Sequence, residues 1–452
     1  MKKTKIAGIL ALIILAVILI LPYITSCTII DEETKNANSN EDGADANYAN
    51  SDEGEIETNT ANSNDGKINA VTVKILVNGY DADKDSLETI RELIYDTYGM
   101  NAQITAYDSA GSWDDNKIAT KLLAGDTDFD MYTLSSNLVP YYAKNNACLD
   151  LSSSKGIVDN FSNMFDGLLD ICSVEEKLCG VPVRLNMFYN MWDCNIELAE
   201  KLGLDIASLS TKKITWHEFY DFAAEAKAKA DELGITDFYV LSAWGEDIDP
   251  KIWHYMTNYL DYTNKKIENK TTEYIAYLNL YKKMQDEGLI SKDFAFTARD
   301  SILFTMTGAF SYKACDRQPF PNPLITDGDS YLVEPLMLAI NPKSPNIEAA
   351  KKYLEYATSL PVLQKRVDDY LLKDWDLYEY SDPAGIEMGV GIATTNGHEV
   401  VKFIIKNGKR FYGNDDIYNE IQADAQLLKE RKMSIEDFAQ KLYQKSKMII
   451  EE

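Results

Sequence analysis

The sequence predicts a mixed α/β fold built on a mainly parallel sheet that helices cover on both faces. Three short apolar segments, 70–77, 102–106 and 129–134, have the composition of buried strands. Between them, segments 87–98 and 113–123 carry apolar residues at helical spacing, and a glycine closes each one. Strands that alternate with helices favour parallel strand pairing, because each helix returns the chain to the same edge of the sheet.

The remainder of the chain continues this mixture. Thr215, followed three residues later by Glu218, is typical of a capped helix start. Apolar periodicity predicts helices over 218–233, 273–287, 347–358 and 417–430. Further strands are expected at 238–241, 304–310 and 333–340, and the last third of the chain is largely helical. No internal repeat is visible.

The predicted strands also indicate where a ligand would bind. In sheets of this kind, ligands lie at the carboxyl ends of the strands. The loops 78–85 and 135–139, together with the vicinity of Trp113, follow predicted elements of the first sheet. We therefore expect these positions to face a ligand.

Length and charge limit the function further. The chain has 452 residues, which is enough for two domains with separate cores. Its formal charge of −27 argues against nucleic acid as a partner, because phosphate backbones are bound by lysine and arginine. An anionic membrane would repel the same charge, so contact with a membrane requires an anchor.

The first 26 residues have the pattern of a secretory signal. Three lysines within the first five residues precede an apolar run over 8–21, and Pro22 ends that run. The run is short for a transmembrane helix, which needs about 20 apolar residues, although an uncleaved anchor that extends to Ile30 is the alternative. Ile-Thr-Ser-Cys at 24–27 resembles a bacterial lipobox. The resemblance implies that Cys27 becomes the mature N-terminus and carries palmitate-like acyl chains.

The segment that follows has the composition of a disordered tether. Residues 31–67 contain eleven Asp or Glu and two Lys, with many Asn, Ser, Ala and Gly. Such a segment buries too little apolar surface to offset the entropy lost on ordering. We expect 27–67 to be a lipidated cysteine and an acidic linker that holds a folded module near a membrane.

Five further cysteines leave at least one thiol unpaired, because their number is odd. They are Cys148, Cys172, Cys179, Cys194 and Cys315. Cys172 and Cys179 are near enough in sequence to bridge a small loop, but spacing does not establish a bond. Buried free thiols are the alternative.

Motifs for metals and catalysis do not fit. An apparent calcium loop begins at Asp81, but Ser86 stands where the EF-hand needs glycine and Glu88 where it needs an apolar residue. The three histidines are far apart and form no ligand pair. No nucleophile elbow, P-loop or dinucleotide fingerprint is present. We expect no catalytic residue, no metal and no cofactor.

Several short passages of the sequence are each weak evidence for a family, but their order and spacing together are informative. The sequence reads KLLAGD at 121–126, FDMY at 129–132, ACLDL at 147–151, LCGVP at 178–182, FYN at 188–190, ITWHEF at 214–219, MTGAF at 306–310, AINPKS at 339–344 and EAAK at 348–351. In order and spacing they resemble the extracellular solute-binding proteins of bacterial ABC importers, in the family of maltose-binding protein. Residues 360–452 match that pattern only loosely.

The resemblance implies a two-lobed fold of the type II periplasmic-binding-protein class, with strands crossing a hinge between the lobes. Lobe one would hold 68–178 and 306–334. Lobe two would hold 179–305 and 335–452. The ligand would lie between the lobes.

Ligand-binding candidates follow from this architecture. Trp244 stands in a loop after a predicted strand, with Trp253 soon after, and aromatic rings stack on sugar faces; core packing is the alternative role. Arg184 and Asn186 follow the predicted hinge at Pro182. Trp113 is a further candidate, since its vicinity is expected to face a ligand. For the remaining candidates the alternative is the role of an ordinary solvated residue: Tyr80, Asp81, Ser136, Asn137, Tyr312 and Glu334.

The expected protein is a monomeric lipoprotein on the outer face of a bacterial membrane. It would capture a carbohydrate and deliver it to the membrane permease of an ABC transporter. A binding protein for a peptide or polyamine, a secreted carbohydrate-active enzyme and a receptor without a transporter are the alternatives.

Overall fold

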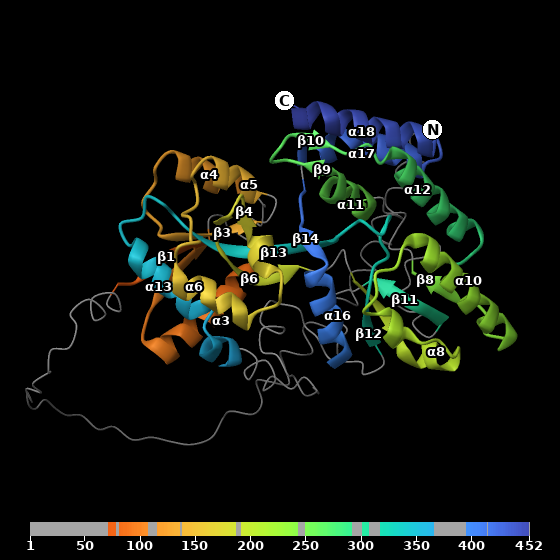
Figure 1. The fold of residues 1–452 in the computed structure, drawn as a ribbon, viewed down its shortest axis with the longest axis horizontal. Helices are drawn as coiled ribbons and strands as arrows, with labels where there is room; N and C mark the ends of the chain where they lie inside the picture. The colour runs from red at the N-terminus through yellow and green to blue at the C-terminus, as the bar shows by residue number, and fades with distance from the viewer. Residues whose placement is uncertain are drawn as a thin grey trace, which may run out of the picture. The chain divides into compact units, whose positions relative to one another are not determined.

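The computed structural model describes residues 71–77, 81–106, 115–135, 138–186, 191–242, 249–291, 301–306, 317–365, 395–413 and 415–451. These residues form two hydrophobic cores, and each core is built around its own sheet (Figure 1). The chain passes from the first core to the second, returns to the first, and ends in the second. The described part is therefore a mixed α/β structure, as predicted.

The first sheet has the order β14–β13–β3–β1–β2, and β6 also pairs with β13. Its strands are β1 (Val73–Val77), β2 (Ala102–Ala106), β3 (Met131–Ser135), β6 (Val181–Asn186), β13 (Tyr331–Ile340) and β14 (Gly408–Arg410). The strands predicted from the first 135 residues are thus present.

The prediction of a mainly parallel sheet is wrong at its centre. β1 runs parallel to β2 and β3, but β13 is antiparallel to both β3 and β6. The reason is topological. β13 enters the sheet from the second core, so it runs in the direction opposite to strands that enter through the local helical connections.

Helices cover both faces of the first sheet. Figure 1 shows α4 (Asp115–Leu123) and α5 (Val139–Lys144) on one side, and α3 (Asp81–Tyr98), α6 (Lys155–Asn160) and α13 (Ile347–Ala357) on the other. α3 begins at Asp81, so it takes up part of the loop predicted at 78–85; acidic residues are favoured at a helix N-terminus. The first core also includes these elements: helix η2 (Phe161–Asn163), α7 (Leu168–Cys172), the hairpin β4 (Ser173–Val174) and β5 (Lys177–Leu178), and α16 (Thr395–Lys406).

The second sheet has the order β12–β7–β11–β8, with β11 parallel to β8 and antiparallel to β7. Its strands are β7 (Met191–Asn195), β8 (Tyr239–Leu241), β11 (Ile302–Met306) and β12 (Arg317–Pro321). The elements around it are α8 (Ile196–Lys201), α9 (Ile206–Leu209), α10 (Trp216–Glu232), α11 (Asp249–Tyr259), the hairpin β9 (Leu260–Asp261) and β10 (Lys266–Ile267), α12 (Thr271–Asp286), α17 (Asp415–Lys429) and α18 (Ile435–Glu451).

The predicted cap at Thr215 is confirmed. The Thr215 side chain accepts a hydrogen bond from the Glu218 backbone N–H, and the Glu218 carboxylate accepts one from the Thr215 backbone. This reciprocal cap starts α10 and turns Trp216 into the second core, where its ring lies 5.7 Å from that of Trp192. Trp216 is therefore a packing residue.

Two of the passages that carry the family resemblance meet at Asp130. Its buried carboxylate accepts hydrogen bonds from the Lys74 backbone N–H at 2.8 Å and from the Ser344 hydroxyl at 2.6 Å. Asn341 donates from its side chain to the carbonyl oxygens of Asp126 and Phe129. Residues 126–130 and 341–344 therefore form one polar joint where β1, β3 and the end of β13 meet.

The cores differ from the expected division of the chain. The segment from 335 onward was expected in lobe two, but 336–340 of β13 pair with β3, and α13 and α16 pack in the first core. The hydrophobic residues of α17 and α18 pack in the second core. Gly180 marks the close approach of β6 to β13, because a Cβ there would come within 2.8 Å of the Leu338 carbonyl oxygen.

The cysteines in the described part of the chain are buried free thiols: Cys148, Cys172, Cys179 and Cys194. The hydrogen bond that the Cys148 thiol donates to Cys179, together with burial, raises the pKa of Cys148 above its usual range. Burial raises the pKa of Cys172 to about 12. Cys148 and Cys172 are thus poor nucleophiles at neutral pH.

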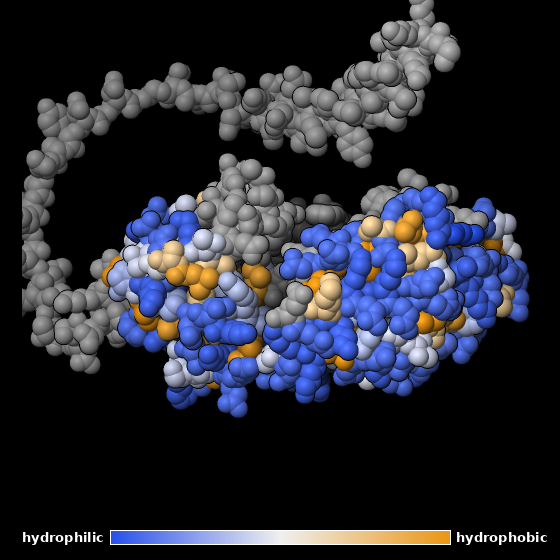
Figure 2. Space-filling view, turned by 90° about the horizontal axis from the view of Figure 1, so that it is seen from above, coloured by the Kyte–Doolittle hydropathy of each residue, from blue (hydrophilic) through white to orange (hydrophobic). Residues whose placement is uncertain are grey.

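The outer surface is mainly hydrophilic on the face seen in Figure 2. The large apolar side chains that the described residues expose, such as Tyr95, Leu233 and Met448, are far apart in sequence. Within the described ranges, no helix combines the length and the apolar composition that a membrane crossing requires.

Candidate functional site

Strand register brings several predicted ligand-binding positions to one edge of the first sheet. Ser135, the last residue of β3, pairs with Leu336 of β13. Arg184 of β6 pairs with the same Leu336, and Asn186 pairs with Glu334. The backbones of Arg184, Asn186 and Glu334 therefore lie next to the carboxyl end of β3, where ligands bind in such sheets.

Glu334 is partly exposed on β13, two residues from Leu336. Asp81 is the first residue of α3, four residues after the end of β1. The other predicted positions of the site lie outside the described residues, and Cys27 does so too: Tyr80, Trp113, Ser136, Asn137, Trp244 and Tyr312. In the sequence, Tyr80 and Ser136 come shortly after the last residues of β1 and β3, and the parallel pairing of these two strands places both strand ends at the same edge of the sheet.

Trp253 lies on α11, away from these strand ends. Its ring stacks on Tyr418 of α17 with 4.5 Å between centroids, and it meets Phe411 edge-on at 5.5 Å. The side chain packs against the second core and is partly buried. These contacts give Trp253 a packing role, and its contact with a ligand stays a prediction.

Helix α11 also holds the chain where it enters β13. Asp329, two residues before β13, is buried, and its Oδ2 accepts hydrogen bonds from Tyr259 Oη and from the Thr326 backbone N–H, both at 3.0 Å. His254 Nε2 lies 3.0 Å from the same oxygen. Asn258 both donates to and accepts from the backbone of Ser330. One face of α11 thus fixes the entry of the crossing strand.

The carboxylate of Asp329 is held in its charged form. Burial by itself would raise the pKa of Asp329, but the hydrogen bond and charge of His254, with the hydrogen bonds from Thr326, together lower it below its usual value. The charged form of such a buried carboxylate is stable only while its hydrogen-bond donors are in place. Asp329 is therefore a fixed joint of the second core and not a free acid or base.

The same helix holds the chain where it leaves β14. Lys409 donates from Nζ to the Asn258 carbonyl oxygen at 3.2 Å. The Tyr412 backbone N–H donates to the Thr257 hydroxyl at 3.2 Å, and this hydroxyl donates back to the Tyr412 carbonyl oxygen. Two of the three crossings between the cores are thus anchored on consecutive residues of α11.

Arg410 links this anchor to the first core. Its Nη2 donates to the Ser173 carbonyl oxygen at 2.8 Å, and its guanidinium lies 5.2 Å from the ring centroid of Tyr412. The ring of Tyr412 in turn lies 5.1 Å from that of Tyr262, in the β9–β10 hairpin. The side chain therefore joins α7 and the β4–β5 hairpin to the second core.

Residues of both cores enclose a cavity of about 920 Å³ beside this link. One wall contains Leu138 and Tyr141 of the α5 region, and the opposite wall contains Tyr262 and Tyr412. A space of this size is ample for a small-molecule ligand. Leu138 directly follows the predicted positions Ser136 and Asn137, so the cavity borders the edge described above.

Sequence reasoning missed the anchor on α11 and this cavity. His254 and Asn258 stand four residues apart, which places them on one helix face, but nothing near them in the sequence indicates Asp329 as a partner. Among the described residues, no group of three His, Cys, Asp or Glu is arranged to hold a metal ion.

The sequence matches a known protein family. A family model described as bacterial extracellular solute-binding protein matches residues 83–361. A search of curated protein sequences gave no match.

Solved structures with the same fold include three with 15–16% sequence identity, each of which covers 84% of this chain. A family 1 solute-binding protein from Alicyclobacillus acidocaldarius has a TM-score of 0.60 over 99% of its chain. The sugar-binding protein MalE from Xanthomonas citri has a TM-score of 0.60 over 97%, and maltose-bound MalE3 from T. maritima has 0.57 over 100%.

These proteins are two-lobed, and the two cores and three crossings described above correspond to that architecture. The family match covers more than half of the 452 residues. The chain belongs to the bacterial extracellular solute-binding protein family.

Proposed function

We propose that the chain captures a carbohydrate between its two lobes and delivers it to the permease of an ABC transporter. The observation that carries the proposal is the meeting of Arg184, Asn186 and Glu334 with the end of β3, at the point where the chain crosses between the cores. Polar groups at such a position fix the orientation of a ligand while aromatic rings stack on it. Two of the similar structures are of sugar-binding or maltose-bound proteins.

The mechanism follows from the architecture. A ligand that contacts both lobes binds the closed arrangement better than the open one, and its differential affinity shifts the population toward closure. A permease that recognises the closed arrangement would then distinguish loaded from empty protein. The protein itself would carry out no reaction, and no metal or cofactor is needed for this cycle.

Delivery requires that the protein stays near the membrane. We place it on the outer face of the bacterial cell membrane, tethered through acyl chains on Cys27 and the acidic segment 27–67. Two acyl groups supply the apolar contact that stable anchoring requires. The described residues expose few large apolar side chains, which supports a monomer.

The ligand class is tested by thermal-shift measurements on the purified chain with oligosaccharides, monosaccharides, short peptides and polyamines. A carbohydrate that binds the native state raises the melting temperature by mass action. Mass spectrometry of the ligand afterwards separates capture from hydrolysis. If only a peptide or a polyamine stabilised the chain, the proposed carbohydrate ligand would be wrong. If the ligand were cleaved, the chain would be an enzyme and the proposed capture function would be wrong.

The site is tested with Glu334→Gln, and Glu232→Gln, at the exposed end of α10, serves as the control. A hydrogen bond to a charged group contributes about 1.5–3 kcal/mol, which corresponds to a loss of affinity of about tenfold to a hundredfold. If the Glu334 variant and the control bound the ligand found in the screen with equal affinity, Glu334 would not be a residue of the binding site.

The anchor is tested by mass spectrometry of the mature chain from a bacterial host. We expect residues 1–26 to be absent and the N-terminal peptide to carry a diacylglyceryl group and an acyl chain on Cys27. Cys27→Ala should lose both modifications. An intact N-terminus in the native protein would favour an uncleaved membrane anchor.

A further inference from the structure

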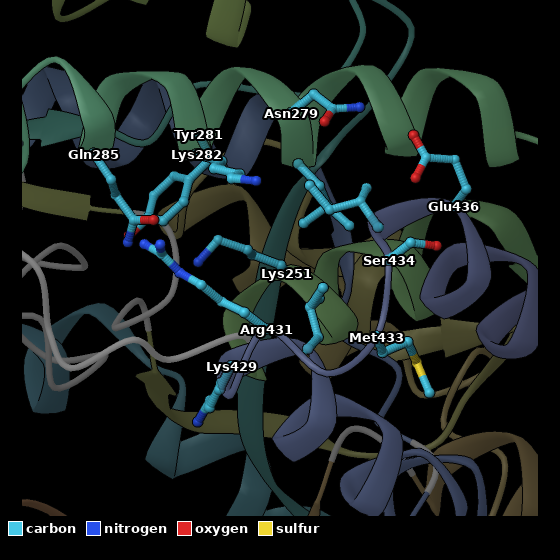
Figure 3. A pocket seen from close by; sticks show the side chains of 13 residues that line it. Lys251, Asn279, Tyr281, Lys282, Gln285, Lys429, Arg431, Met433, Ser434 and Glu436 are labelled. Atoms are coloured by element: carbon cyan, nitrogen blue, oxygen red, sulfur yellow. The ribbon is translucent and has the colours of Figure 1, made fainter.

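A second cavity lies entirely within the second core and has a basic lining. It measures about 310 Å³ and is formed by α12, by Lys251 of α11, and by the turn that joins α17 to α18 (Figure 3). Four basic side chains line it, Lys251, Lys282, Lys429 and Arg431, against one acidic side chain, Glu436. The lining is therefore mainly basic, although the chain as a whole has a formal charge of −27.

Lys251 is built into the wall of this cavity. The residue is 9% exposed, and its Nζ lies 3.8 Å from the ring centroid of Tyr281. The Tyr281 ring packs edge-on against Trp216, which belongs to the second core. The ammonium group is thus held by a rigid aromatic support, which is the geometry of a cation–π contact.

Arg431 approaches Lys251 from the opposite wall. It stands at the α17–α18 turn with φ of +58°, and its backbone N–H donates to the Leu428 carbonyl oxygen. Figure 3 shows its guanidinium directed toward the end of the cavity where Lys251 and Gln285 lie, with Lys282 and Lys429 nearby. The turn therefore directs an arginine toward a lysine that is already buried.

Two acidic residues of the α17–α18 region are placed away from the guanidinium of Arg431. Glu430, which precedes Arg431, accepts hydrogen bonds from Lys432 at 2.7 Å and from Gln426 at 2.8 Å. Glu436 lies at the opposite end of the cavity from Arg431 in Figure 3. Basic side chains that line one cavity repel each other, and an anion bound among them would replace this repulsion with attraction.

The remaining polar lining suits an anion with several acceptor oxygens. Gln285 lies beside the cations, and Asn279 and Ser434 line the cavity further along. Ser434 directly precedes α18, and its hydroxyl accepts a hydrogen bond from the Asp437 backbone N–H. Guanidinium and ammonium groups together recognise phosphate and sulfate by charge-assisted hydrogen bonds.

We propose that this cavity binds a compact oxyanion, namely phosphate or sulfate, either free or as a group on a small soluble molecule. The site is distinct from the interlobe site because its lining comes from the second core alone. Its volume admits a small molecule and excludes a polymer. Binding would join α11, α12 and the α17–α18 turn, so the anion acts as a bridge within lobe two.

The test is a titration of the full-length chain with inorganic phosphate at constant ionic strength, followed by melting temperature and by isothermal calorimetry. Sodium chloride at matched ionic strength is the salt control. We expect a saturable response to phosphate or sulfate and none to chloride. In the double variant Lys282→Gln/Arg431→Gln, the concentration at half saturation should rise by about tenfold or more.

Lys283→Gln is the matched control, because Lys283 is the next residue on α12, pairs with Glu287 and does not line the cavity. It should bind phosphate as the native chain does. Circular dichroism of each variant in phosphate-free buffer shows that it folds. Arg431→Lys, which keeps the charge, should recover part of the binding.

Three results would overturn the proposal. One is a native chain that does not respond saturably to phosphate or sulfate. Another is a double variant that binds as tightly as the Lys283 control. The third is recruitment to phosphatidylglycerol vesicles without any response to the free anions, since the ligand would then be a membrane surface. Carbohydrate binding is measured separately in each variant, so the outcome does not depend on the interlobe site.

Discussion

Replacing Asp329 with asparagine tests the joint between the second core and the crossing strand. The carboxylate accepts hydrogen bonds from the Tyr259 hydroxyl and from the backbone N–H and hydroxyl of Thr326, and it lies 3.0 Å from His254 Nε2. A hydrogen bond to a charged group contributes about 1.5–3 kcal/mol and a neutral one about 0.5–1.5 kcal/mol. Asparagine keeps the shape and loses the charge, at a cost of about 1 kcal/mol per bond.

The substitution also removes the free-energy cost of burying a charge, and this offsets part of the lost hydrogen-bond energy. We therefore expect Asp329→Asn to lower the free energy of unfolding by about 2 kcal/mol at pH 7. Asp329→Ala, which leaves all the donors without an acceptor, should cost about 3–5 kcal/mol. The assay is urea unfolding followed by tryptophan fluorescence, and Asp166→Asn, at an exposed position, is the control.

The pH dependence has a defined sign. The pKa of Asp329 is lower in the folded protein than in the unfolded chain, so its contribution is complete above the unfolded value of about 3.9. It is lost as the pH falls below about 4, through the folded pKa. The difference between the native chain and Asp329→Asn should therefore shrink between pH 5 and pH 3. A loss below about 0.5 kcal/mol at pH 7, or a constant difference down to pH 3, would refute the reasoning.

Three further predictions concern the first core. Asp130→Ala should lower the free energy of unfolding by about 3 kcal/mol in urea titrations, because it removes the hydrogen-bond acceptor shared by β1 and the turn after β13. A change under about 1 kcal/mol would contradict this role of Asp130. Gly180→Ala should cost about 1–3 kcal/mol in the same assay, since its Cβ would meet the Leu338 carbonyl oxygen, and unchanged stability would show that β6 shifts freely. In a chain carrying Cys27→Ala, Cys194→Ala and Cys315→Ser, the three buried thiols of the first core should react with an aromatic disulfide reagent only after denaturation, and rapid reaction of the native chain would show that the first core opens.

Local sequence signals predicted the elements that depend on local physics. Thr215 and Glu218 are a complete cap within four residues, so the start of α10 was predictable. The apolar runs that form β1, β2 and β3 are similarly self-contained. The family resemblance added the two-lobed architecture, which composition and periodicity do not contain.

Long-range pairing could not be predicted in the same way. Residues 336–340 were assigned to lobe two, yet they pair with β3, about 200 residues earlier in the chain. The burial of Asp329 depends on α11, which is some 70 residues distant in sequence. Acids are common in this chain, so neither the sequence around Asp329 nor its composition separates it from a solvated carboxylate. Arg184 and Asn186 came from the hinge expectation and Glu334 did not, so their convergence became visible only through the register of β6 with β13.

The central position of β13 has a consequence for biosynthesis. Its partners β3 and β6 are complete by residue 186, but β13 ends only at Ile340, so the first sheet lacks its middle strand while more than 150 further residues are made. During that interval the facing edges of β3 and β6 carry unpaired backbone groups, which are sites for association with other chains. The second core is likewise completed only by α17 and α18 near the C-terminus. Neither lobe can finish folding while the chain is still being synthesised. The contacts that complete the two lobes join residues that are far apart in sequence, and such contacts slow folding. Chains truncated before residue 340 should therefore aggregate instead of yielding a folded first lobe.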